Sequence, residues 1–384
     1  MFSGRLDWSL QANPVTRLLH EKRAARAEIL DLTESNPTRA QLSYPEQEIL
    51  AALADRRSLL YEPGPAGLRH AREAIAEYHG GIDPEHIILT ASTSEAYSLL
   101  FKLLADPGDE VLAPRPSYPL FEFLANLDSV RVVQYPLVYH EGWAIDFEAL
   151  GERATERTRA VVVVNPNNPT GSFLKKDELD QLITFCADRD AAILSDEVFA
   201  DYTLGTDTRR VRSLSGVRDV LTFSLSGLSK VVGLPQMKLG WIAVSGPDNL
   251  RTTAIERLEL IADTYLSVNT PVQWAAPKLL CLCDRIQSQI SNRVRDNLAI
   301  LRDRCAGKDS PWSVLDVEGG WYATLQAPKI RTEEEWVLHL LRDHNVLVQP
   351  GFFFDFDIEA FLVVSLLAPP DIFREGINRL CALG

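Results

Sequence analysis

The sequence lacks the features that mark a membrane protein or a nucleic-acid-binding protein. None of its uninterrupted apolar runs approaches the roughly 18–20 residues of a membrane-spanning helix. Basic residues are in the minority, with 39 lysines and arginines against 53 aspartates and glutamates, so the net charge of −14 does not suit phosphate binding. The first 26 residues contain charges and no apolar core of a signal peptide. We therefore expect neither a membrane nor a nucleic acid as a partner.

Cysteine is also scarce, and the spacing of the cysteine residues matches no metal-binding pattern. There are five, at Cys186, Cys281, Cys283, Cys305 and Cys381. The closest pair, Cys281 and Cys283, lies in a run with helical character, where core packing explains them better than a zinc site does. An odd number of cysteines in a long chain favours a reduced compartment. We predict a cytoplasmic protein with no metal site.

What the sequence does contain is an alternation of short apolar runs with amphipathic ones. Strands are predicted at 86–90, 109–114, 130–136, 159–166, 191–197 and 219–226, and helices at 94–105, 118–127 and 175–190. Such an alternation indicates βαβ units and a mostly parallel sheet, hence an α/β fold. Because ligands bind beyond the carboxyl ends of the strands in such sheets, the polar residues that follow each strand are the candidate site.

The C-terminal part of the sequence follows a different pattern. Long helices are predicted at 246–266 and within 271–305, and helices at 332–344 and 369–383 follow. Strand-like runs lie between and around the last two helices, at 312–326, 345–350 and 360–367. These elements predict a smaller α+β domain over about residues 290–384.

Five kinds of polar or aromatic group follow the predicted strands. They are residues 92–94 (Ser-Thr-Ser), Tyr118, Asn168, Asp196 and Lys230. Each has an ordinary structural explanation when taken alone: a helix cap for residues 92–94 and Asp196, and a turn for the stretch around Asn168. Taken together, they place a helix N-terminus, an aromatic ring, an amide, a carboxylate and an amine at one edge of one sheet.

This set of groups suits pyridoxal 5'-phosphate. The aldehyde of that cofactor needs an amine, with which it forms a Schiff base. Its pyridine nitrogen must stay protonated to act as an electron sink, and a buried carboxylate holds the proton there. Its phosphate suits the N–H groups of a helix N-terminus, and its ring stacks on an aromatic side chain.

Three motifs carry a specific resemblance, and they are "NPNNPTG" (165–171), "SDEVFADY" (195–202) and "GLSKVVGLPQMKLGW" (227–241). In order and spacing they resemble the class I/II aminotransferases of pyridoxal-phosphate fold type I, in the aspartate aminotransferase superfamily. The resemblance runs from about Asn36 to the end of the chain. It implies a large domain at 46–289 with a mostly parallel seven-stranded sheet between helices. It also implies a small domain built from 1–45 and 290–384, and a homodimer.

The resemblance implies roles for individual residues. Lys230 matches the Schiff-base lysine, which also serves as general base, and Asp196 matches the partner of the pyridinium nitrogen. Asn168 matches the donor to the ring hydroxyl, and Tyr118 matches the stacking ring. The phosphate site is matched by Ser92, Thr93 and Ser94, by Lys238 in place of an arginine, and by Tyr61, which would reach the neighbouring subunit's phosphate.

The chain departs from the family pattern at two further positions. Phe199 stands where the family usually has a tyrosine, which removes one hydrogen bond to the ring oxygen. Val363 aligns with the arginine that grips the substrate's α-carboxylate, and a valine cannot pair with a carboxylate. Ser35 and Arg39, in and just after the segment that lines the substrate side, are tentative substrate residues, and Arg115 is a weaker candidate.

The residues and the resemblance together favour an aminotransferase that moves an amino group between an amino acid or amine and a 2-oxo acid through Lys230. A pyridoxal-phosphate-dependent β-lyase or cyclase is an alternative, and Val363 adds weight to it. A sensor module that binds the cofactor without turnover is a third hypothesis. The intact set of Lys230, Asp196 and Asn168 and the negative net charge count against a sensor.

Overall fold

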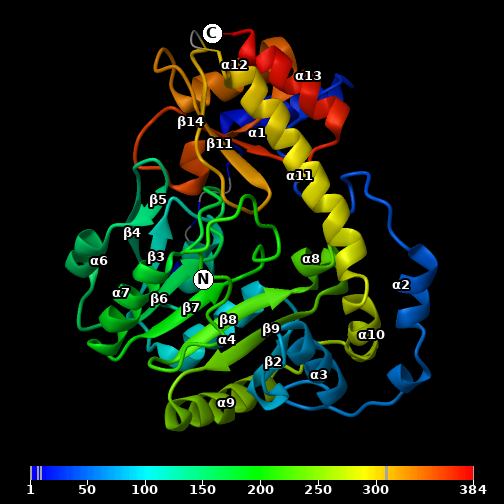
Figure 1. Ribbon diagram of the computed structural model, residues 1–384, viewed down its shortest axis with the longest axis vertical. Helices are drawn as coiled ribbons and strands as arrows, with labels where there is room; N and C mark the ends of the chain where they lie inside the picture. The colour runs from blue at the N-terminus through cyan, green and yellow to red at the C-terminus, as the bar shows by residue number, and fades with distance from the viewer. Residues whose placement is uncertain (1, 7, 9–10, 308–309, 384) are drawn as a thin grey trace.

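An eight-stranded sheet forms the centre of the computed structural model, which describes residues 2–6, 8, 11–307 and 310–383. The strands lie in the order β2-β9-β8-β7-β6-β3-β4-β5, from β2 at the lower right to β5 at the left of Figure 1. Their bounds are β2 Ile87–Thr90, β3 Glu110–Arg115, β4 Arg131–Tyr139, β5 Trp143–Ile145, β6 Thr158–Val164, β7 Ala192–Asp196, β8 Thr222–Gly227 and β9 Gly240–Ser245. The five strands from β8 to β4 pair in parallel, whereas β9 is antiparallel to both of its neighbours and β5 is antiparallel to β4.

The α/β class is confirmed, and the sheet is a mixed one. It has eight strands rather than the seven expected, because the short β5 adds an antiparallel edge through a hairpin with β4. The six strands predicted from apolar runs are all present. Neither β5 nor β9 was among them; β5 has only three residues, and β9 begins within the motif that ends at residue 241.

Helices cover both faces of this sheet and bury its side chains. They are α3 Arg69–Tyr78, α4 Thr93–Leu104, α5 Leu120–Leu127, α6 Phe147–Arg153, α7 Lys176–Ala187, α9 Asp248–Asp263 and α10 Thr270–Leu280. Successive residues of β6 face opposite layers, as a strand requires: Val162 packs in the cluster with α4, α5 and α9, and Val161 and Val163 pack in the cluster with α6 and α7. A central parallel strand is buried on both faces, which explains its continuous apolar run.

The C-terminal elements lie above the large sheet in Figure 1. They are α11 Cys283–Cys305, β10 Ser313–Val314, β11 Tyr322–Gln326, α12 Glu333–His344, β12 Val346–Leu347, β13 Gln349–Pro350, β14 Phe361–Ser365 and α13 Pro370–Cys381. A four-stranded antiparallel sheet has the order β10-β11-β14-β13. Thr332 and Glu335 form a capping box that starts α12, as the threonine and glutamate at this spacing favour.

The N-terminal segment joins these C-terminal elements. It contains α1 Pro14–Ala24 and β1 Leu30–Asp31, and β1 pairs in parallel with β12. The expected domain boundary at residue 289 falls inside α11, a 23-residue helix that runs from the upper elements toward α10 in Figure 1. The division into 46–289 and 1–45 with 290–384 therefore stays a prediction.

The remaining described elements are short. They are η1 Gly4–Leu6, α2 Glu46–Leu53, η2 Arg56–Leu59, η3 Pro84–His86, α8 Leu228–Val231, η4 Pro235–Met237 and η5 Gly351–Phe354. Across the described ranges, no helix combines the length and the apolar character that crossing a membrane requires.

Candidate active site

An open cavity lies at the carboxyl ends of the parallel strands. Asp196 is the last residue of β7, Asn168 follows β6, and Lys230 lies in α8 directly after β8. Nine of the twelve residues predicted for the site line this cavity: Ser35, Ser92, Thr93, Ser94, Tyr118, Asn168, Asp196, Phe199 and Lys230. The parallel sheet brings them together because it aligns the ends of β6, β7 and β8.

Asp196 is a buried carboxylate on the floor of the cavity. It accepts hydrogen bonds from the Tyr97 hydroxyl at 3.2 Å and from the Val198 N–H at 3.2 Å. Burial raises the pKa of Asp196 to about 6, although both hydrogen bonds and the charge of Lys230 oppose the rise. The sequence motifs did not single out Tyr97. The sequence feature that could have identified it is its position in α4, one turn after Thr93 and on the buried face of that helix.

Lys230 shares the cavity with Asp196, as the Schiff-base interpretation requires. Burial lowers the pKa of its amine to about 8, and the Asp196 carboxylate opposes this effect. The Nζ atom lies 4.7 Å from the ring centroid of Trp321 and 5.3 Å from that of Phe199. The Tyr202 hydroxyl donates a hydrogen bond to the backbone carbonyl of Lys230.

Trp321 is a site residue that the sequence motifs missed. It is fully buried, and its ring packs edge-on against Phe199 at 5.2 Å and Tyr202 at 5.0 Å between centroids. It directly precedes Tyr322, which lines the cavity at the start of β11. Nothing in the local sequence signals this position, because its contact with Lys230 joins residues 91 positions apart.

Several polar groups around the cavity are left available for a ligand. The buried Oδ1 of Asn168 has no hydrogen-bond partner among the described residues. Ser92 caps α4 by accepting a hydrogen bond from the Glu95 N–H at 3.2 Å, so the capping interpretation holds for this residue. Thr93 and Ser94 form the first turn of α4, where backbone N–H groups lack partners within the helix. The positive end of the α4 dipole therefore lies at the cavity.

Three predicted residues do not line the cavity. The side chain of Lys238 is exposed just after η4, at a residue with a φ of 53°. Tyr61 is 75% exposed and borders a different cavity, beside Tyr265. Arg39 is exposed as well. The roles assigned to these three residues stay predictions.

The position expected to hold a carboxylate-binding arginine lies in an apolar environment. Val363 is fully buried in β14, in a cluster that includes Trp143, Leu315 and Phe354. Arg115 does not line the cavity, because its guanidinium pairs with Asp357 and donates to the carbonyl of Asp355. Among the described residues that line the cavity, Lys230 is the one with a cationic side chain. The described residues also bring together no group of three or more His, Cys, Asp or Glu that could hold a metal.

An α/β fold with an amine and a buried carboxylate in one cavity at the sheet edge defines the class of this molecule as an enzyme with a small-molecule site. The chain belongs to the aminotransferase class I and II family, whose model matches residues 27–379. The predicted family and the predicted aminotransferase activity are thereby confirmed.

Individual relatives agree with this assignment. The chain is 29% identical over 371 residues to the alanine aminotransferase of Mycobacterium tuberculosis, with 92% of this chain and 84% of that protein covered. It is also 29% identical over 321 residues to the S-alkyl-thiohydroximate lyase SUR1 of Arabidopsis thaliana, with 80% of this chain and 69% of that protein covered. Among solved structures, it resembles the alanine aminotransferase from Pyrococcus furiosus with a TM-score of 0.89 and 25% identity, over 100% of this chain and 99% of the other.

Proposed function

We propose that this aminotransferase binds pyridoxal 5'-phosphate in the cavity and attaches it to Lys230. It would then move an amino group between an amino acid or amine and a 2-oxo acid. The observation that carries the proposal is that Lys230 and Asp196 line one cavity, with an amine whose pKa is lowered to about 8. When bound, the cofactor supplies an electron sink for the negative charge that develops at the substrate carbon.

The described residues fit this cofactor. The unpartnered amide oxygen marks Asn168 as a side chain free to turn its amide toward the ring oxygen. Thr93 and Ser94 would hold the phosphate at the N-terminus of α4, and Tyr118, whose ring borders the cavity, would stack on the pyridine ring. Asp196 would hold the proton on the ring nitrogen, and this positive charge would lower the pKa of its carboxyl group again.

Lys230 has a second role once the substrate's amine takes its place on the cofactor. Its Nζ atom would then be free to accept the proton that leaves the substrate's Cα atom and to hold it for return. An amine with a pKa of about 8 keeps a useful neutral fraction near neutral pH, whereas an exposed lysine does not. Trp321 and Phe199 beside the Nζ atom limit the access of water to it.

A β-lyase or cyclase reaction is the second candidate function. Two observations favour it: a valine buried among apolar side chains at position 363, and a relative named as a lyase. Both reactions start with removal of the same Cα proton, so the floor of the cavity suits either. The sensor hypothesis has no observation in its favour.

We also propose a cytoplasmic homodimer that shares its active sites. Tyr61 is exposed together with its neighbours Leu59, at 89%, and Leu60, at 60%, so the three form an apolar surface that suits a subunit contact. Tyr61 would reach the phosphate in the partner's cavity. The five cysteines are free, in keeping with a reduced compartment.

The test begins with purified protein saturated with pyridoxal 5'-phosphate. Borohydride reduction should fix the cofactor on the peptide that contains Lys230, and Lys230→Ala should abolish that product in mass spectra. A panel of amino acids and amines should then convert the bound cofactor to its amine form without releasing ammonia. Release of ammonia without that conversion would identify the lyase reaction instead, and labelling of a different lysine would refute the proposal.

A further inference from the structure

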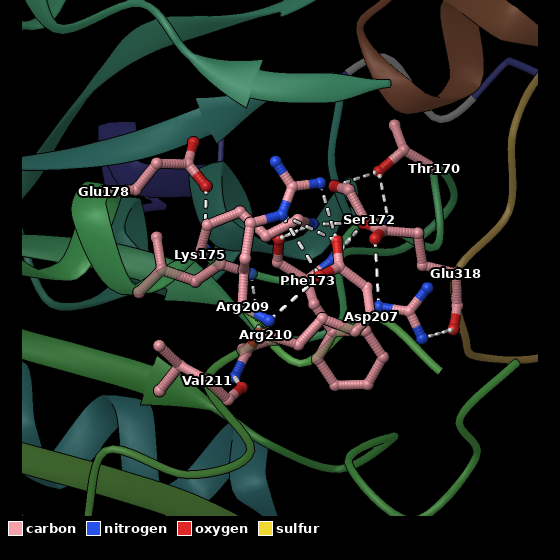
Figure 2. Close-up of polar contacts among 12 residues, drawn as sticks. Thr170, Ser172, Phe173, Lys175, Glu178, Asp207, Arg209, Arg210, Val211 and Glu318 are labelled. Atoms are coloured by element: carbon pink, nitrogen blue, oxygen red, sulfur yellow. Dashed lines mark hydrogen bonds and ion pairs between the residues drawn. The ribbon is translucent and has the colours of Figure 1, made fainter. Parts of the chain in front are cut away.

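Glu318 is a partly buried residue outside the cavity, and its carboxylate forms ion pairs with two cationic side chains. Its Oε2 atom lies 2.6 Å from the Nζ of Lys175 and its Oε1 atom lies 3.0 Å from the Nε of Arg210, as Figure 2 shows. The Phe173 N–H also donates to Oε2 at 3.0 Å. The three charged side chains are only 12–15% exposed. Charge-assisted hydrogen bonds in such a sheltered place are strong and fix the carboxylate in one geometry.

The backbone around Glu318 is bound to the loops that follow β6 and β7. Its N–H donates to the Gly171 carbonyl at 3.2 Å, and its own carbonyl accepts from the Leu204 N–H at 2.7 Å. The Gly320 N–H donates to the Tyr202 carbonyl at 2.8 Å. Residues 317–322 are therefore joined to the loop that carries Asn168 and to the segment that follows Asp196.

Gly319 shows how closely these segments approach one another. A Cβ atom at this position would lie 2.6 Å from the Cε2 of Phe173 and 2.6 Å from the carbonyl oxygen of Tyr202. Neither distance is compatible with a real side chain. The absence of a side chain at Gly319 therefore lets this segment pack directly against Phe173 and Tyr202.

Residues 317–320, which these contacts fix, lead directly to Trp321, the side chain that covers the Lys230 amine and is called the cover below. Trp321 and Tyr322 are the next residues after Gly320, and the Trp321 ring lies 4.7 Å from the Lys230 Nζ atom. Tyr202, which accepts the Gly320 hydrogen bond, also binds the Lys230 carbonyl through its hydroxyl. One end of this short segment is thus fixed by Glu318 and the other end touches the residue on which the chemistry depends.

We propose that Glu318 is a positioning residue: by binding Lys175 and Arg210 it holds Trp321 over the Lys230 amine and keeps water away from it. Because the role concerns Lys230 as the cofactor-binding lysine, it rests on the proposed function. If the ion pairs of Glu318 are lost, Trp321 is no longer held over the amine and water reaches it. Water stabilises the protonated form of Lys230, so the pKa of its amine rises.

The direction in which the pKa of Lys230 changes distinguishes a positioning role of Glu318 from a direct effect of its charge. Removing the Glu318 charge alone would leave Lys175 and Arg210 uncompensated, and their field would lower the pKa of Lys230. Entry of water would raise it. The titratable groups that line the cavity with the amine are Asp196 from β7, Tyr118 and Tyr322, and the Tyr202 hydroxyl binds the Lys230 backbone carbonyl. None of them changes in the experiment.

The variant to test is therefore Lys175→Met with Glu318→Gln, which removes one charge of each sign. Its matched control is Asp207→Asn with Arg209→Gln, which removes an exposed ion pair of 2.8 Å from the same region, also drawn in Figure 2. Each cofactor-free protein is pulsed with acetic anhydride between pH 6.5 and 10.5. The acetylated fraction of the Lys230 peptide, measured by mass spectrometry, gives the pH midpoint of the amine.

We expect a midpoint near 8 for the wild-type protein and the control pair, and an upward shift on the order of one pH unit for the Glu318 variant, toward the ordinary lysine value. An unchanged or lowered midpoint would refute the positioning role. Gly319→Ala is the second variant, which displaces the same segment without altering any charge; it should raise the midpoint too, and it decides the matter if the double variant does not fold. Since the cofactor is absent from this experiment, its failure is distinguishable from a failure of the borohydride test above.

Discussion

The floor and the cover of the cavity are built in different ways. On the floor, Asn168, Asp196 and Lys230 each lie at or just after the carboxyl end of their own strand, and the parallel sheet aligns the three strand ends. In the cover, Trp321 is held by contacts between segments far apart in the chain: the Glu318 carboxylate meets Lys175 across 143 positions and Arg210 across 108. In the proposed function, the floor would supply the reacting groups, and the cover would adjust the environment in which they react.

The two regions also differ in polarity. The floor presents an amide, a carboxylate and an amine, whereas Val363 in β14, the strand that pairs with β11 beside Trp321, lies in a closed apolar cluster. In the proposed function, the groups that would act on the substrate's reacting carbon are therefore the ones that short motifs identify. Recognition of the rest of the substrate would, in that function, depend on residues outside these short motifs.

The largest effect should follow from a change on the floor, Lys230→Ala. We expect activity to fall by about 10⁴-fold or more, because proton transfer by a positioned group alone contributes about 10²–10⁴-fold and the covalent attachment is lost as well. The measurement is the rate of amino transfer with the best donor of the panel. Retention of more than a tenth of the wild-type rate would show that another amine performs the chemistry.

Asp196→Asn should have opposite effects on activity and on the stability of the cofactor-free protein. We expect activity to fall by about 10²–10³-fold, the range for loss of a preorganised charge-stabilising group. Because burial raises the pKa of Asp196 from 3.8 to about 6, the carboxyl group's contribution to stability is present below about pH 4 and is lost as the pH rises through 6. Asparagine avoids that loss, so the variant should be more stable than the wild type by up to about 3 kcal/mol at pH 8.

Urea unfolding of the two cofactor-free proteins at pH 4 and pH 8 checks this prediction. The difference in the free energy of unfolding should be small at pH 4 and should favour the variant at pH 8. A variant that is less stable at pH 8 would mean that Asp196 is ionised at little cost, and its environment on the floor would then have to be more polar than the structure shows.

The sequence allowed the floor to be predicted almost completely and the cover hardly at all. The continuous apolar run of β6 and the motifs after β6, β7 and β8 are local, so they identify both the strands and the residues that follow them. Trp321 and Glu318 look like ordinary residues of a strand-rich segment until the fold joins them to Lys230 and Lys175. Tyr97 is intermediate, since its helix was predicted but its hydrogen bond to Asp196 was not.

A smaller effect is expected from Val363→Thr, in the strand next to the cover. The shape hardly changes, but a hydroxyl group enters an apolar cluster, so the free energy of unfolding should fall by about 1–3 kcal/mol. The preference among amino donors should stay the same, because Val363 does not line the cavity. Val138→Thr, on the half-buried β4, is the control and should cost less than about 0.5 kcal/mol. A changed donor preference in Val363→Thr would place this side chain in contact with the substrate.

The smallest effect should come from Phe199→Tyr, at the boundary between the floor and the cover. Phe199 lines the cavity and packs against Trp321, and a hydroxyl group added there could donate to the ring oxygen of the bound cofactor. That hydrogen bond competes with the Schiff-base proton for the same oxygen, so the pKa of the Schiff base should fall. A single hydrogen bond of about 0.5–1.5 kcal/mol corresponds to a shift of about one pH unit or less. The pH dependence of the cofactor's visible absorbance measures this shift, and the rate of amino transfer should change by less than about tenfold. A rise in the pKa, or no change, would show that residue 199 belongs to the cover alone, in contact with Trp321 but not with the cofactor.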